Sequence, residues 1–205
     1  MSLGSYDTDS KALKKRILIQ NIGGKNDLNS WILKHAEIQR GNRVLDLGCG
    51  TGEQSLKVSK LIGKEGQLHS LDVSKESLEF LNKEAKKLKL NNINTVLSDF
   101  DNIPDYIINS QFDRVISSYS LYYSKTPEKL LANIAKMLSL EGRFFFCAPS
   151  ENNNQEIRNF IGSLEKENNI LENKSVKIID YFIEKHAQRY FKDIKFYSFE
   201  NPIFF

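Results

Sequence analysis

The chain has 205 residues, of which 40% are hydrophobic and 27% are charged, and its formal net charge is +3. This length and composition exclude a largely disordered protein and favour one domain with a full hydrophobic core. No apolar run approaches the roughly 18 to 20 residues of a membrane span, and the N-terminus lacks the apolar stretch of a signal peptide, so we expect a cytoplasmic protein without a membrane partner. Two cysteines and three scattered histidines give no disulfide framework and no metal site.

Residues 1–41 are expected to form two short cap helices before the core. The first runs from Ser10 to about Gln20. The second begins after Asp27 as N-cap and carries Leu28, Trp31 and other apolar residues at helical spacing.

Strands and helices alternate over residues 42–149. Each short apolar run stops at a turn and is followed by a helical pattern, with Ser74 and Thr126 as N-caps and Gly142 as the end of the last helix. The expected strands are 44–47, 68–73, 94–98, 112–118 and 143–148. This alternation predicts an α/β fold with a doubly wound, mostly parallel sheet in a three-layer α/β/α arrangement.

The remainder of the chain is predicted to complete this single domain. Residues 150–192 start with a polar loop and continue with two helices, about 155–168 and 176–190, which form a helical cap. Residues 193–205 contain one further strand candidate, 194–199. Only one strand candidate therefore follows the fifth strand.

A glycine-rich turn at residues 44–52, VLDLGCGTG, is the sharpest motif. Glycines between a strand and a helix let the backbone approach a ligand, and the helix N-terminus offers N–H groups to an anionic or nucleotide-like group. The third glycine, Gly52, comes four residues after Gly48, whereas the dinucleotide fingerprint has five, and Asp46 precedes the first glycine by two residues. Both details point away from a nicotinamide dinucleotide.

Acidic residues follow two further strands at the same edge of the sheet. Asp72 lies 20 residues after Gly52, where a carboxylate can accept two ribose hydroxyls. Asp99 follows the third strand, where it can accept from an adenine amino group while Phe100 lies against the ring; Asp101 is an alternative to Asp99. Acids at three strand ends favour a ligand with a cationic end.

Taken in order, VLDLGCGTG, Asp72, Ser98-Asp99-Phe100, FDRVISSYSLYY and LSLEGRFFF resemble the class I S-adenosylmethionine-dependent methyltransferases. The resemblance covers residues 40–149 and is strongest to the small-molecule enzymes of quinone and biotin pathways. It implies a Rossmann-like methyltransferase fold, S-adenosyl-L-methionine as cofactor, and methyl transfer by in-line displacement. The sheet of this family usually has seven strands and ends in an antiparallel pair, so the resemblance implies that the last strand is absent or that the chain is truncated. It also implies that the glycine loop wraps the methionine part, Asp46 reaches its amino group, Asp72 binds the ribose and Asp99 the adenine. The cofactor-binding residues expected from motif and resemblance are Asp46, Gly48, Cys49, Gly50, Gly52, Asp72, Val73, Asp99, Phe100, Ser117 and, as a lid, Tyr6.

The acceptor side is less defined by the sequence. Tyr119, Tyr122 and Tyr123 follow the fourth strand and are candidates for an aromatic wall around the sulfonium and the acceptor, with packing as the alternative for the last two. His186 is a candidate general base, with a plain surface role as the alternative. The leading hypothesis is methyl transfer to O, N or C of a small molecule by a monomer or homodimer.

Other functions stay open on the sequence. An RNA or protein methyltransferase, or a catalytically silent cofactor-binding partner module, would use the same core. Cys147 lies near the end of the fifth strand, where some RNA cytosine methyltransferases have a nucleophilic cysteine. Those enzymes also have a prolyl-cysteine after the fourth strand, where this chain has Ser117-Ser118-Tyr119, so Cys147 is expected to be structural rather than nucleophilic. The Asn/Asp-Pro-Pro-Tyr/Phe box of enzymes that methylate base amino groups is also missing, which disfavours a nucleic-acid partner.

Overall fold

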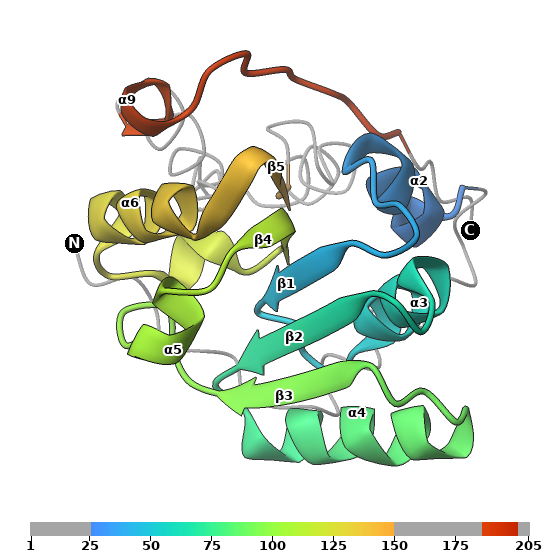
Figure 1. The fold of residues 1–205 in the computed structure, drawn as a ribbon. Helices are drawn as coiled ribbons and strands as arrows, with labels where there is room; N and C mark the ends of the chain where they lie inside the picture. Colours follow the sequence, from blue (N-terminus) through green and yellow to red (C-terminus); the bar gives the residue numbers. More distant parts are fainter. Residues whose placement is uncertain (1–25, 150–185, 201–205) are drawn as a thin grey trace, which may run out of the picture.

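A computed structural model of the chain describes residues 26–149 and 186–200. Its centre is a five-stranded parallel sheet of order β3-β2-β1-β4-β5, with helices on both faces (Figure 1). The strands are β1 (Arg43–Leu47), β2 (Gln67–Asp72), β3 (Ile93–Leu97), β4 (Phe112–Ser118) and β5 (Leu138–Cys147). The helices are α2 (Leu28–His35), α3 (Glu53–Ile62), α4 (Lys75–Lys87), α5 (Asp105–Ile108), the 3-10 turn η1 (Leu121–Tyr123), α6 (Pro127–Met137) and α9 (Gln188–Tyr190). The predicted doubly wound α/β fold is confirmed.

Alternation along β1 shows how the sheet is covered on both faces. Val44 is buried in one core cluster with Val58 and Ile62 of α3. Its neighbour Leu45 is buried in a second cluster that includes Leu130 of α6. Successive side chains of a strand point to opposite faces, so a helical layer lies on each side of the sheet. Figure 1 shows α3 and α4 on one side and α5 and α6 on the other.

A side-chain N-cap is present at two of the three helix starts where the sequence predicts one. The Asp27 carboxylate accepts from the backbone N–H of Ser30, and the Ser74 hydroxyl accepts from that of Ser77, as expected for N-caps. Thr126 precedes α6, but its hydroxyl does not cap the helix and instead donates to Asp101 at 2.7 Å. The N-cap role predicted for the Thr126 side chain is therefore wrong.

The junction between α6 and β5 also differs from the prediction. The helix ends at Met137, so Gly142 does not end it, and the strand begins at Leu138 rather than at residue 143. The pairing with β4 is irregular between Phe112 and Arg114, and Leu140 is 99% exposed in this irregular stretch. Because Leu140 is exposed at this register shift, the first residues of β5 come before the part of the strand that pairs regularly with β4. The short elements α5 and η1 were not predicted.

The predicted strand at 194–199 is absent from the described structure, where residues 194–200 have no regular secondary structure. The segment is instead held against α2 by aromatic rings. The Trp31 ring lies 5.3 Å from that of Phe199 and 6.5 Å from that of Tyr197. The apolar residues of this segment therefore pack on α2 instead of forming a strand that pairs with the sheet. The first cap helix and the helix at 155–168 lie outside the described residues, and of the one at 176–190 only the end, α9, is described.

Candidate functional site

The candidate site lies at the carboxyl ends of the parallel strands, between β1 and β4. The chain leaves β1 for β2 on one side, and leaves β4 for β5 on the other, so the strand order reverses between β1 and β4. In open α/β sheets ligands bind in the crevice outside this switch point. The glycine loop after β1 and the segment after β4 both border it.

The glycine loop is held in a backbone conformation that requires glycine. Gly48, Gly50 and Gly52 have φ of 76°, 54° and 83°. A Cβ on Gly48 would lie 2.4 Å from the Cβ of Ser120, and the Gly48 and Cys49 N–H groups both donate to the Leu71 carbonyl at 2.8 and 3.0 Å. The loop therefore lies tightly between β2 and the segment after β4, and its backbone rather than the Cys49 thiol shapes the crevice.

Asp72 ends β2 and connects this loop to α4. Its Oδ2 accepts from the Gly50 N–H at 2.7 Å and its Oδ1 from the Ser74 N–H at 2.8 Å. Burial raises the pKa of Asp72, while these backbone hydrogen bonds lower it. An ionised carboxylate has about four acceptor positions, so two remain for ligand hydroxyls. The next residue, Val73, is 37% exposed at the same edge.

Asp46 is buried beneath the loop, with a relative exposure of 1%. Its carboxylate accepts from the Ser55 hydroxyl of α3 at 2.6 Å, and Ser70 donates to Ser55 at 2.9 Å. Burial raises the pKa of Asp46 to about 7, the Ser55 hydrogen bond lowers it, and the charge of Asp72 raises it. Among the described residues no cation contributes to the pKa of Asp46, so a positively charged ligand group would meet an acid that is not already paired with a cation from this part of the chain.

Serines connect the ends of β1 and β4. The buried Ser117 hydroxyl lies 2.8 Å from that of Ser120, which donates to the Leu47 carbonyl at 2.9 Å. Next to them, the Ser118 hydroxyl donates to Oε1 of Gln54, in the first turn of α3, at 2.8 Å. The crevice is thus bridged from both strands by short polar side chains.

At the end of β3, two acids that the sequence left as alternatives have different surroundings. Within residues 26–149 and 186–200, the Asp99 carboxylate accepts from its own turn alone, from the Asp101 N–H and the Asn102 amide. Asp101 accepts from the Ser124 and Thr126 hydroxyls and from two backbone N–H groups. Burial alone would raise the pKa of Asp101, but the hydrogen bonds from Thr126, Lys125 and Ser124 lower it overall. Asp101 thus fastens the segment before α6, and Asp99 is the freer acceptor.

Phe100 differs from the expectation that its ring lies open to a ligand. It is 5% exposed and belongs to the core cluster on the α6 side of the sheet. A Cβ on Gly48 would meet its ring at 3.1 Å. Phe100 therefore supports the glycine loop from within the core.

Tyr119 follows β4 with φ of 54°, a conformation uncommon outside glycine. Its N–H donates to the Cys147 carbonyl at the end of β5 at 2.8 Å. Burial raises the pKa of Tyr119, and the Cys147 thiol raises it further, so the phenol stays protonated. The rings of Tyr122 and Tyr123 lie 4.8 Å apart, and Tyr123 packs against the α6-side core.

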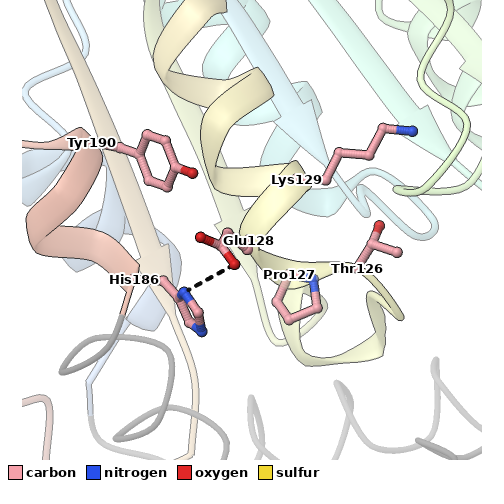
Figure 2. Close-up of a pocket in the computed structure, with 6 residues that line it drawn as sticks. All are labelled: Thr126, Pro127, Glu128, Lys129, His186 and Tyr190. Atoms are coloured by element: carbon pink, nitrogen blue, oxygen red, sulfur yellow. Dashed lines mark ion pairs between the residues drawn. The ribbon is translucent and has the colours of Figure 1, made fainter.

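The His186 side chain is buried, and it lies beside an open hollow of about 530 Å³. Figure 2 shows its ring and the Glu128 carboxylate directed toward each other, with Nδ1 3.8 Å from Oε2. Arg189 donates to the other Glu128 oxygen at 2.7 Å. The cavity is lined by Thr126, Pro127, Glu128, Lys129, His186 and Tyr190.

The structure brings the glycine loop, Asp46, Asp72 and Ser117 together, and places Val73 and Asp99 along the same edge. It turns Phe100 into the core, and Tyr6 lies outside the described residues. Sequence reasoning missed Gln54, Ser55 and Ser120, because serine and glutamine in a helix or loop carry no motif. The described residues contain neither a cluster of metal-binding side chains nor a helix of the length and apolarity that a bilayer crossing demands.

A parallel α/β sheet with a glycine loop at its switch point defines a nucleotide-binding class of domain. Residues 38–196 match the family model described as "Methyltransferase domain", and the chain belongs to that family.

Individual relatives are similar over the core. The aklanonic acid methyltransferase DauC of Streptomyces sp. (strain C5) is 34% identical over 109 residues, which are 53% of this chain and 49% of that protein. Coclaurine N-methyltransferase bound to N-methylheliamine and SAH (S-adenosylhomocysteine) superposes with a TM-score of 0.54 at 27% identity, over 58% of this chain and 34% of that one. A SAM-dependent methyltransferase from Aquifex aeolicus has the same fold, with a TM-score of 0.55 at 22% identity over 66% and 69% of the two chains. This chain spans about half the length of the curated relatives it matches.

Proposed function

We propose that this chain binds S-adenosyl-L-methionine and transfers its methyl group to a small-molecule acceptor. The observation that carries the proposal is the glycine loop at the switch point, held by Asp72 at 2.7 Å, in a chain of the methyltransferase family. Relatives whose names state small-molecule acceptors, such as aklanonic acid and coclaurine, support an acceptor of that kind. We propose O, N or C of that small molecule as the acceptor atom, and a cytoplasmic monomer or homodimer as the working form.

The residues at the site fit this cofactor. Asp46 is an ionisable acid held under the loop by the Ser55 hydroxyl, which suits the ammonium group of the methionine part. Asp72 keeps two acceptor positions for the ribose hydroxyls after binding two backbone N–H groups. Asp99 is available to the adenine amino group because Asp101 is engaged by the segment before α6.

When bound, S-adenosylmethionine supplies a methyl group that is already activated by its sulfonium. The chain's own contribution is then orientation: the loop and the aspartates hold one reactant, and the segment after β4 holds the other. Fixing two reactants in this way is worth about 7 to 11 kcal/mol of barrier. Tyr119, with its buried neutral phenol, contributes an uncharged wall that does not compete as a nucleophile.

We assign the acceptor to the side of the cavity between α6 and α9. A space of about 530 Å³ suits a small molecule, and Thr126, which lines it, follows the segment after β4 closely in the sequence. His186 faces the cavity with Glu128 beside it, so His186 can take a proton from an acceptor hydroxyl or amine while Glu128 stabilises the resulting imidazolium.

The test has two stages. Isothermal titration with S-adenosylhomocysteine is expected to give one site per chain, and no binding at millimolar ligand would remove the proposal. A panel of phenols, amines and enolisable carbonyl compounds is then incubated with radiolabelled cofactor. Transfer that His186→Gln lowers at pH 7 and that higher pH partly restores would support His186 as the base, and an unchanged pH profile would exclude it. Labelling of RNA or protein alone would replace the small-molecule assignment.

A further inference from the structure

Gln54 has a buried amide nitrogen that no other described residue accepts a hydrogen bond from. The side chain is 7% exposed, and its Nε2 has no hydrogen-bond partner within the part of the chain that the structure describes. A buried donor without an acceptor loses its hydrogen bond to water and gains none in return, so it is retained where a ligand supplies the acceptor. Its other end is fixed, because Oε1 accepts from Ser118 at 2.8 Å.

The location of this amide defines the ligand group it suits. Gln54 lies in the first turn of α3, a helix of ten residues that begins directly after Gly52. The N-terminus of a helix carries partial positive charge and attracts anions. The Ser118 contact stretches the side chain toward the end of β4, so an amide donor and a helix N-terminus meet at the switch-point crevice. Both favour the same partner, a carboxylate.

We propose that Gln54 is the residue that recognises the carboxylate of the methionine part of the cofactor. This inference rests on the proposed function and assigns its missing contact. The amino-acid end of that ligand is a zwitterion, and α3 offers matching groups on successive residues: Ser55 holds the acid Asp46 for the ammonium, and Gln54 presents Nε2 for the carboxylate. Ser118 is a positioning residue that fixes which face of the amide points to the ligand.

Isothermal titration with two ligands isolates this contact. S-adenosylhomocysteine carries the carboxylate, and its decarboxylated analogue keeps the amine, thioether and nucleoside. Gln54→Leu is expected to weaken S-adenosylhomocysteine about 10- to 100-fold while leaving the decarboxylated analogue within about twofold. Gln67→Leu, at the amino end of β2 on the opposite edge of the sheet, is the matched control and leaves both unchanged.

Two further variants keep the proposal testable if the leucine variant does not fold. Gln54→Glu retains the size of the side chain but places a negative charge against the carboxylate, so it weakens S-adenosylhomocysteine more than the analogue. Ser118→Ala gives a smaller loss with the same ligand preference. Equal weakening of both ligands, or none, in any folded Gln54 variant overturns the inference while the proposed function stands. Absence of any binding by the wild-type chain would instead remove the proposed function itself.

Discussion

The carboxylate of Asp72 accepts the backbone N–H of Gly50 at 2.7 Å and therefore fastens the glycine loop to the end of the neighbouring strand. Its second oxygen accepts from Ser74 at 2.8 Å, the residue that caps α4. One side chain thus orders two successive connections at the carboxyl edge of the sheet. An acid that the sequence predicts as a ligand contact thus also fixes the backbone that borders the crevice.

Asp72→Asn is expected to weaken S-adenosylhomocysteine binding at least about tenfold and to lower the free energy of unfolding by about 1 to 2 kcal/mol. The amide has one acceptor oxygen, so either Gly50 or Ser74 loses its partner and the ribose loses an ionised acceptor. Titration calorimetry and urea unfolding measure the two effects. Asp105→Asn, at an exposed position of α5, is the control. Wild-type affinity in Asp72→Asn would show that the carboxylate does not contact the ligand.

Gly48 is expected to tolerate no side chain. Gly41 is a control that separates the two reasons, a left-handed backbone and steric overlap with Ser120. Gly41 has φ of 83° and open space where a methyl group would lie, whereas Gly48 has φ of 76° and the Ser120 Cβ 2.4 Å from the corresponding position. Gly41→Ala should therefore lose only about 1 to 2 kcal/mol of stability from its left-handed backbone. Gly48→Ala should lose about 1 to 3 kcal/mol more from overlap.

Urea unfolding of both variants measures this difference. Adding Ser120→Gly to Gly48→Ala removes the overlapping Cβ and should restore part of the loss, as a positive coupling in a double-mutant cycle. Equal destabilisation of Gly41→Ala and Gly48→Ala would mean that the loop is not packed against Ser120.

The raised pKa of Asp46 predicts that the stability of the ligand-free chain depends on pH. Its pKa is raised by burial from 3.8 to about 7, so between these values the native state binds more protons than the unfolded state. Stability from this group therefore falls as pH rises from about 4 to about 7, by at most about 4 kcal/mol, and is constant above. Asp46→Asn lacks this titration, so the variant should gain stability relative to wild type as pH rises through the window.

Urea unfolding at pH 5, 6, 7 and 8 tests the Asp46 prediction, with Asp105→Asn as a variant whose curve should stay parallel to that of wild type. The same Asp46→Asn chain should bind S-adenosylhomocysteine more weakly, because the ammonium group loses its acid. Parallel stability curves for wild type and Asp46→Asn would contradict the assignment of a buried titrating carboxylate.

Helix ends that are set by neighbouring residues could be predicted from the sequence. Contacts between residues that are distant in sequence could not. Helix α3 runs from Glu53 to Ile62, and its ends can be read from the sequence because Gly52 and Gly63 flank the helical pattern. The role of Asp101 could not be foreseen, since its partner Thr126 is 25 residues away in sequence. Phe100 has the same apolar character whether it faces a ligand or the core, and only the packing around Gly48 decides between them.

Cys147 is expected to resist alkylation in the folded chain. Burial raises its pKa to about 11, and a hydrogen bond from Tyr119 lowers it only in part. Because the thiolate is the reactive form, iodoacetamide at pH 8 should modify Cys147 about a hundredfold more slowly in the native chain than in urea. Peptide mapping by mass spectrometry follows each cysteine separately. Equal rates in both states would show that the end of β5 is open to solvent.

Phe199 is expected to hold the segment after α9 on α2 through Trp31, the single tryptophan of the chain. Phe199→Ala should shift the Trp31 emission to longer wavelength and lower the free energy of unfolding by about 1 kcal/mol, since it removes a ring contact at 5.3 Å. Phe196→Ala is the matched control, because Phe196 is 70% exposed and should leave both readouts unchanged. If both variants shift the emission alike, the segment is not anchored at Phe199, and the aromatic contact that replaces the predicted strand would have to lie elsewhere.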